Sequence, residues 1–120
     1  MDKHINLGKL GEDIAVQYLK KKGYKIIERN YRKKWGELDA IVLSPNKTLV
    51  FVEVKTVSGP MPQIRGEDQV TASKLKKLRR VAEIYANGEG ESLIKNGWRI
   101  DLITITTEKE SARVRHYKNI

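Results

Sequence analysis

The chain has 120 residues, of which 39% are hydrophobic and 32% are charged, and its formal net charge is +9. This length fits one domain with a single core, which we place at residues 1–120, and the composition is typical of a soluble globular protein. The positive excess favours polyanionic partners, either nucleic acid or an anionic membrane surface. No apolar run approaches the roughly 20 residues that span a bilayer, and the chain opens without a secretory segment. We therefore expect a cytoplasmic protein with no membrane role.

Cysteine is absent, which excludes disulfides, thiolate zinc sites and cysteine nucleophiles. The two histidines, His4 and His116, lie near the two ends of the chain, which argues against a histidine metal site or Ser-His-Asp chemistry. Any catalytic chemistry must therefore come from carboxylates, lysines or arginines.

Apolar periodicity and turn residues predict two helices and five strands. Gly23 ends the first helix, and Thr71 is a suitable N-cap for the second. A loop is expected over residues 57–67, which contain two prolines and a glycine before Arg65. The order α-β-β-β-α-β-β predicts an α/β fold with a mixed sheet flanked by helices. The expected elements are a helix over 6–22, strands over 24–31, 36–43 and 49–55, a helix over 71–86, and strands over 98–105 and 113–117.

The second and third strands form the most informative feature of the sequence, a hairpin with charged ends. A hairpin folded about Asn46 opposes Asp39 to Glu53 and Glu37 to Lys55. These positions are all odd-numbered, so their side chains are expected on one face of the sheet. The pattern predicts an apolar base that ends in two opposed carboxylates with a lysine beside them.

Two like charges directly opposite on a sheet are destabilising, so Asp39 against Glu53 calls for a cation. Converging carboxylates are hard oxygen ligands, suited to Mg²⁺, Mn²⁺ or Ca²⁺. Lys55 could orient a water or offset a developing negative charge. The alternative is an ordinary surface ion pair between Glu53 and Lys55. The position of Glu53 inside the apolar run 49–54 favours the functional interpretation.

Three further features could serve a nucleic acid. Lysines crowd the amino-terminal half of the second helix, where a phosphate would be favoured by the helix dipole and by the free backbone N–H groups. The link before Gly36 carries three cations and Trp35, which could stack on a base. The helix could equally carry a merely solvated basic face, and the link could be an ordinary basic turn with a packed Trp. Glu12, just after Gly11 at the margin of the first helix's apolar stripe, could be functional or simply solvated. The cations are Arg32, Lys33, Lys34, Lys74, Lys76 and Lys77.

Several segments of the sequence together form a specific pattern. They are residues 8–15, 23–32, 36–39, 51–56, Lys74 followed by Ala82 and Tyr85, and 98–103. This pattern, which covers nearly the whole chain, resembles the bacterial YraN family, which is uncharacterised. The YraN family is in turn similar to the PD-(D/E)XK nuclease superfamily, which includes archaeal Holliday-junction resolvases and restriction endonucleases.

The resemblance implies a restriction-endonuclease-like fold and a set of site residues. Asp39 and Glu53 would be the metal-binding acids, Lys55 the lysine of the signature, and Glu12 the additional acid from the first helix. It also implies frequent dimerisation. One departure is that Leu38, and not proline, precedes the first acid.

The leading hypothesis is a metal-dependent endonuclease that hydrolyses DNA, on a branched or damaged structure. Asp39, Glu53 and the backbone carbonyl of Val54 would hold Mg²⁺ or Mn²⁺, while Lys55 and Glu12 assist. Cutting two strands with one site per chain would favour a homodimer. The first alternative is a catalytically silent nucleic-acid-binding module that keeps the nuclease fold, and the second is a subunit that recruits a partner.

Overall fold

The computed structural model describes residues 6–59 and 70–120 and confirms the predicted order of elements. The two helices each have a side-chain N-cap, Asn6 for the first and Thr71 for the second, as expected for the second from the sequence. Neither of the helices in the described residues is long and apolar enough to cross a membrane. The elements are α1 (Leu7–Lys21), β1 (Lys25–Lys33), β2 (Gly36–Leu43), β3 (Leu49–Ser58), α2 (Ala72–Asn87), η2 (Glu91–Leu93), β4 (Trp98–Glu108) and β5 (Ser111–Tyr117).

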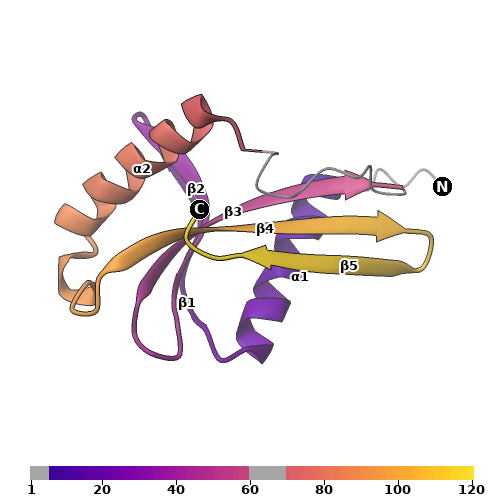
Figure 1. The fold of residues 1–120 in the computed structure, drawn as a ribbon, viewed down its shortest axis with the longest axis horizontal. Helices are drawn as coiled ribbons and strands as arrows, with labels where there is room; N and C mark the ends of the chain where they lie inside the picture. Colours follow the sequence, from indigo (N-terminus) through magenta and orange to yellow (C-terminus); the bar gives the residue numbers. More distant parts are fainter. Residues whose placement is uncertain (1–5, 60–69) are drawn as a thin grey trace.

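The five strands form one mixed sheet in the order β1-β2-β3-β4-β5. The chain makes antiparallel hairpins at both ends of the sheet, and β3 pairs with β4 in parallel. A parallel pair needs a crossover connection, and α2 lies within the one between β3 and β4. α1 and α2 cover opposite faces of the sheet (Figure 1). The mixed sheet flanked by helices is therefore confirmed.

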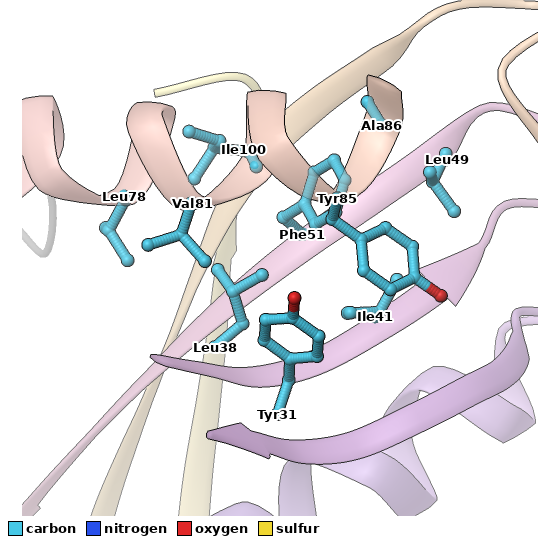
Figure 2. Close-up of a cluster of buried hydrophobic side chains, with 11 residues drawn as sticks. Tyr31, Leu38, Ile41, Leu49, Phe51, Leu78, Val81, Tyr85, Ala86 and Ile100 are labelled. Carbon is cyan, nitrogen blue, oxygen red and sulfur yellow. The ribbon is translucent and has the colours of Figure 1, made fainter. Parts of the chain in front are cut away.

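Alternating side chains of the sheet form two apolar layers, one under each helix. Figure 2 shows the layer beneath α2, in which the Tyr85 ring packs edge-on against Tyr31 and Phe51. The other layer packs α1 against the opposite face. The buried members of the α1 layer are Ala15, Leu19, Tyr24, Ala40, Val42, Val50, Val52, Ile103 and Ile105.

Several boundaries differ from the sequence-based prediction, among them the end of β4 at Glu108 and the start of β5 at Ser111, and two further differences lie near the site. β1 ends at Lys33, beyond the expected end at Tyr31, because its pairing with β2 continues to Lys33 and Gly36. β3 continues to Ser58, where a loop was expected from residue 57, because Ser58 still pairs with Thr107 of β4. Residues 60–67 of the expected loop lie outside the described residues.

A buried carboxylate ties β4 to the carboxyl-terminal segment. Asp101 is fully buried and accepts hydrogen bonds from Arg99 Nε at 2.9 Å, the Asn119 backbone N–H at 2.9 Å and His116 Nε2 at 2.7 Å. Burial by itself would raise the pKa of Asp101, but the bonds from His116, Arg99 and Asn119 outweigh it and lower the pKa overall. Tyr18 on α1 also contacts His116, with its hydroxyl 3.1 Å from Nδ1. This network explains how a carboxylate is accommodated at a fully buried position of β4.

We expect Asp101→Ala to destabilise the fold by about 3–5 kcal/mol, because it leaves the partners of a buried charge without their acceptor. The wild-type contribution should be present above the ordinary aspartate pKa and should be lost as the pH falls, since folding lowers this pKa. Urea unfolding at pH 7 and pH 3 measures both effects. Asp13→Ala, which removes a surface ion pair with Arg29, is the control and should change stability little. An Asp101→Ala protein as stable as the control would contradict this account.

Candidate active site

The predicted register of the β2–β3 hairpin is confirmed at its apolar base. Ile41 pairs with Phe51, and the ladder between the two strands ends at Ala40 and Val52. Just beyond this point the Asp39 carboxylate accepts a hydrogen bond from the Val54 backbone N–H, with Oδ2 at 2.7 Å from the nitrogen. A side chain thus takes the place of the next ladder bond.

The expected pairing of Asp39 with Glu53 does not continue the ladder, and the strict alternation of faces fails here. Leu38 lies in the layer beneath α2, whereas Ala40 lies in the layer beneath α1. Residues two apart share a face in a regular strand, so the backbone of β2 departs from regular geometry around Asp39. The prediction that Glu37 opposes Lys55 is wrong, because the β2–β3 ladder ends at Ala40 and Val52, before it reaches these two residues. Glu37 pairs only on its other side, with Arg32 of β1.

Glu12 is brought to this point by an unusually close approach of α1 to β3. A Cβ on Gly11 would lie only 1.8 Å from the Thr56 side-chain oxygen, so only glycine fits at this position. Burial and the negative charge of Asp39 raise the pKa of Glu12 above its usual value. The helix residue that was ambiguous from sequence therefore lies beside the first acid of the hairpin.

Glu53 is the most perturbed of the acids. Its side chain is only 18% exposed, and burial together with the neighbouring Asp39 charge raises its pKa to about 7. The repulsion predicted between Asp39 and Glu53 is therefore present, although the two residues are not a regular cross-strand pair.

Two cations predicted to hold a nucleic-acid backbone instead contact these acids. Lys74 Nζ of α2 lies 3.4 Å from Glu53 Oε2. Arg32 Nε lies 3.2 Å from Glu37 Oε2, and its terminal nitrogen lies 3.9 Å from Asp39 Oδ1. Both cations are about half exposed, so each pair is screened by solvent and contributes little to stability. No sequence pattern indicated these contacts, since they join separate elements.

Lys55 and Glu53 share the lining of a hollow of about 300 Å³ at the start of α2, together with Lys74 and the helix cap Thr71. Lys55 is exposed, as its assigned role requires. A carboxylate, two amines and a helix N-terminus together make a hollow that can take an anionic group next to the acids.

The remaining four predicted cations lie at the β1–β2 turn and on two different sides of α2. Lys33 lies over the Tyr31 ring, with Nζ 5.4 Å from the ring centroid, and Lys34 is exposed in the β1–β2 turn. Lys77 is on the same stripe of α2 as Lys74, three residues away. Lys76 lines a different hollow with residues 79, 80 and 83, on the side of α2 away from the acids.

The oxygen atoms near Asp39 are of the kind that binds a hard divalent cation. Val54 donates its N–H to Asp39, and the N–H and C=O of an extended residue point to the same neighbouring strand. The Val54 carbonyl therefore faces the side where Asp39 lies, beyond the end of the ladder. Oxygen donors from Asp39, Glu53 and this carbonyl suit Mg²⁺ or Mn²⁺. In residues 6–59 and 70–120, no three carboxylate or histidine side chains gather as a metal cluster.

His116 plays no part in this arrangement, because Asp101 holds it in the network between β4 and β5. His4 lies outside the described residues.

We expect Glu53→Gln to stabilise the protein at high pH. Folding raises the pKa of Glu53 from its ordinary value to about 7, so the wild-type protein loses stability as the pH rises through this range. The loss should not exceed about 3 kcal/mol, the free energy that corresponds to the pKa shift. Urea unfolding in EDTA at pH 5 and pH 8.5 should show a gain for the variant mainly at pH 8.5. Glu83→Gln, which changes an exposed glutamate of α2, should give no gain at either pH. A pH-independent effect of Glu53→Gln would mean that Glu53 is not strained by its surroundings.

Comparisons with family models and with related proteins identify the same family. The model of an uncharacterised protein family, UPF0102, matches residues 11–105. A UPF0102 protein of Thermotoga petrophila is 39% identical over 100 residues, covering 83% of this chain and 86% of that protein. One from Syntrophomonas wolfei is 36% identical over 118 residues, covering 94% and 95%, and one from Alkaliphilus oremlandii is 38% identical over 117 residues with the same coverage.

Among solved structures, the chain is similar to Pyrococcus furiosus SfsA in complex with Ca²⁺, at 19% identity and a TM-score of 0.38. The match covers 93% of this chain and 62% of the SfsA chain. The YraN resemblance, the family match and the relatives agree, and the chain belongs to the UPF0102 (YraN) family.

Proposed function

We propose that the protein is a metal-dependent endonuclease that hydrolyses DNA phosphodiester bonds, on branched or damaged DNA. The observation that supports this most is the convergence of Asp39, Glu53 and Glu12 where β2 and β3 part, with the pKa of Glu53 raised by burial and by Asp39. Glu53 and Glu12, from β3 and α1, each lie beside Asp39 of β2, and a hollow lined by Lys55 and Lys74 adjoins Glu53. Structural stability gives no reason for this crowding, since it costs folding free energy.

Asp39, Glu53 and the Val54 carbonyl would hold Mg²⁺ or Mn²⁺. Such an ion lowers the pKa of a bound water and stabilises negative charge on a phosphate. The Val54 N–H keeps the Asp39 carboxylate in place, because a charge-assisted hydrogen bond fixes one of its oxygens. Glu12 would orient its neighbour Asp39 or a water from the α1 side.

Lys55 would offset the charge that develops on the scissile phosphate. Its amine lines the same hollow as Glu53, and an amine in that position can approach a bound phosphate oxygen or orient the attacking water. Lys74 would hold the adjacent phosphate once Glu53 has another cation. These contacts read no base, so affinity should come from the backbone and fall with salt.

The proposal has two further requirements, which concern the oligomeric state and the location in the cell. One site per chain favours a homodimer if both strands of a duplex are cut. A cytoplasmic location, which the substrate requires, remains an expectation from the sequence.

One observation favours the silent binding module as a second candidate. Lys74 already neutralises Glu53 at 3.4 Å, and Arg32 approaches Asp39 at 3.9 Å, so part of the repulsion is relieved without a metal. A protein that keeps these pairs on nucleic acid would bind without cutting.

We expect cleavage of labelled single-stranded, duplex or four-way-junction DNA with Mn²⁺ or Mg²⁺ and none with EDTA. Asp39→Asn and Glu53→Gln should each reduce the rate at least about 100-fold, as the loss of a metal ligand does. Both should keep or tighten DNA binding, because each removes a negative charge. Glu83→Gln is the matched control and should cut at the wild-type rate. Cleavage by Glu53→Gln at the wild-type rate would refute the site, and binding without cleavage in any metal would support the silent module.

We expect Lys77→Ala to flatten the salt dependence of DNA affinity by about one unit of slope, whereas Lys76→Ala should not. Lys77 is on the stripe of α2 that carries Lys74, and Lys76 faces the other hollow. Titration of the same oligonucleotide between 50 and 200 mM salt compares the two variants. Equal slopes for both would mean that DNA lies elsewhere.

A further inference from the structure

Trp35 is the most exposed large hydrophobic residue in the described part of the chain. It lies in the turn between β1 and β2, and it is 44% exposed. The proposed chemistry of the acids does not use it. Lys33 and Lys34 precede it directly in the chain. An exposed indole among cations needs an explanation, because tryptophan is usually largely buried.

The turn that carries Trp35 is held firmly in place. Gly36 follows it with a φ of +143°, and a Cβ there would lie 2.2 Å from a methyl carbon of Val81 on α2. Only glycine therefore allows the hairpin to lie this close to the helix. Trp35 also lies near the hydroxyl of Tyr31, whose own ring is buried beneath α2. The indole is thus exposed but oriented, which lowers the entropy cost of stacking on it.

The same turn is linked to the acids. Arg32, three residues before Trp35, contacts Asp39 and Glu37. On α2, Val81 lies against the turn, and Lys74 contacts Glu53. These two residues are seven apart and so lie on the same side of the helix, which therefore runs from the acids to the turn. Lys77 lies on this side of α2 between the two. Cations therefore lie along the surface that joins the indole to the carboxylates.

This combination fits a strand of nucleic acid better than a protein partner. A polyanion satisfies the lysines along its backbone, and an indole face offers stacking to any base, at about 1–3 kcal/mol per base. A duplex keeps its bases stacked inside, so an indole on a surface turn reaches only bases that are already unpaired. The chain's net charge of +9 makes a second copy of the same surface a poor occupant.

We propose that Trp35 stacks on an unpaired base of a nucleic-acid strand whose backbone crosses Lys77 toward the acids. This assigns single-stranded or branched nucleic acid, rather than uninterrupted duplex, as the substrate class of the site. The assignment rests on the proposed function for the identity of the reaction, but the contact itself is a binding property and needs no turnover.

The test measures binding alone, in EDTA and in the Glu53→Gln background, so that cleavage plays no part. Trp35→Ala should weaken binding to a single-stranded oligonucleotide about 10-fold, within the range of one lost stacking contact, and should leave binding to blunt duplex unchanged. Trp35→Phe should retain most of the affinity, since it keeps an aromatic face. Leu7→Ala is the matched control, because Leu7 is another exposed hydrophobic residue, on α1 at the other face of the sheet, and should change neither affinity.

A fluorescence measurement separates stacking from a change in fold. Trp98→Phe leaves Trp35 as the one tryptophan of the chain, and its emission should be quenched by the single strand but not by blunt duplex. Equal weakening of both DNAs by Trp35→Ala, or weakening of neither, would overturn the inference. If the parent protein binds duplex but Trp35 has no effect, this inference alone fails. If the parent binds no nucleic acid, the proposed function fails with it.

Discussion

The hydrogen bond from the Val54 N–H to the Asp39 carboxylate is the contact on which the site depends. It stands where the β2–β3 ladder ends, so the two strands can part without leaving this N–H unpaired. The parting makes room for the acids, and the bond fixes one of them. Without it, the strands would either pair further and fill this space with cross-strand contacts, or leave a polar backbone group without a partner at the cost of stability.

The rest of the sheet supports this one departure from regularity. Beneath it, the pairs from Ala40 to Leu43 hold β2 on β3, and every side chain in these pairs is buried except that of Leu43, which is partly buried. Beside it, β3 continues in parallel pairing with β4 as far as Ser58. Glu53 and Lys55 are therefore held in the sheet by β4, although they lie beyond the end of the β2–β3 ladder. α1 approaches β3 through Gly11, and α2 approaches β2 where Val81 lies against Gly36. A side chain on either glycine would block the contact.

The sequence predicted the parts of this arrangement that follow from local rules. Alternation and the turn at Asn46 were enough for the hairpin register, because a slip of one residue would have turned every apolar side chain to the wrong layer. The same rules failed at Asp39, where Leu38 and Ala40 lie in opposite layers and the carboxylate bonds to Val54, since no pattern in β2 itself indicates this break. Lys74 and Arg32 were recognised as important cations but were assigned to a nucleic acid alone, because contacts between separate elements depend on the tertiary fold.

The exposure of the ion pairs decides how the charges of the site are balanced. Lys74 is 46% exposed and Arg32 45%, so water screens both and each pair contributes on the order of 0–1 kcal/mol. That is less than the cost implied by a pKa of about 7 for Glu53, in which the attraction of Lys74 is already included. The carboxylates thus remain under net repulsion with both cations in place. A divalent cation among them would relieve this repulsion more fully than either side chain does, and it would free Lys74 and Arg32 for phosphates. The same residues can therefore serve the acids in the free protein and a nucleic-acid backbone in the complex.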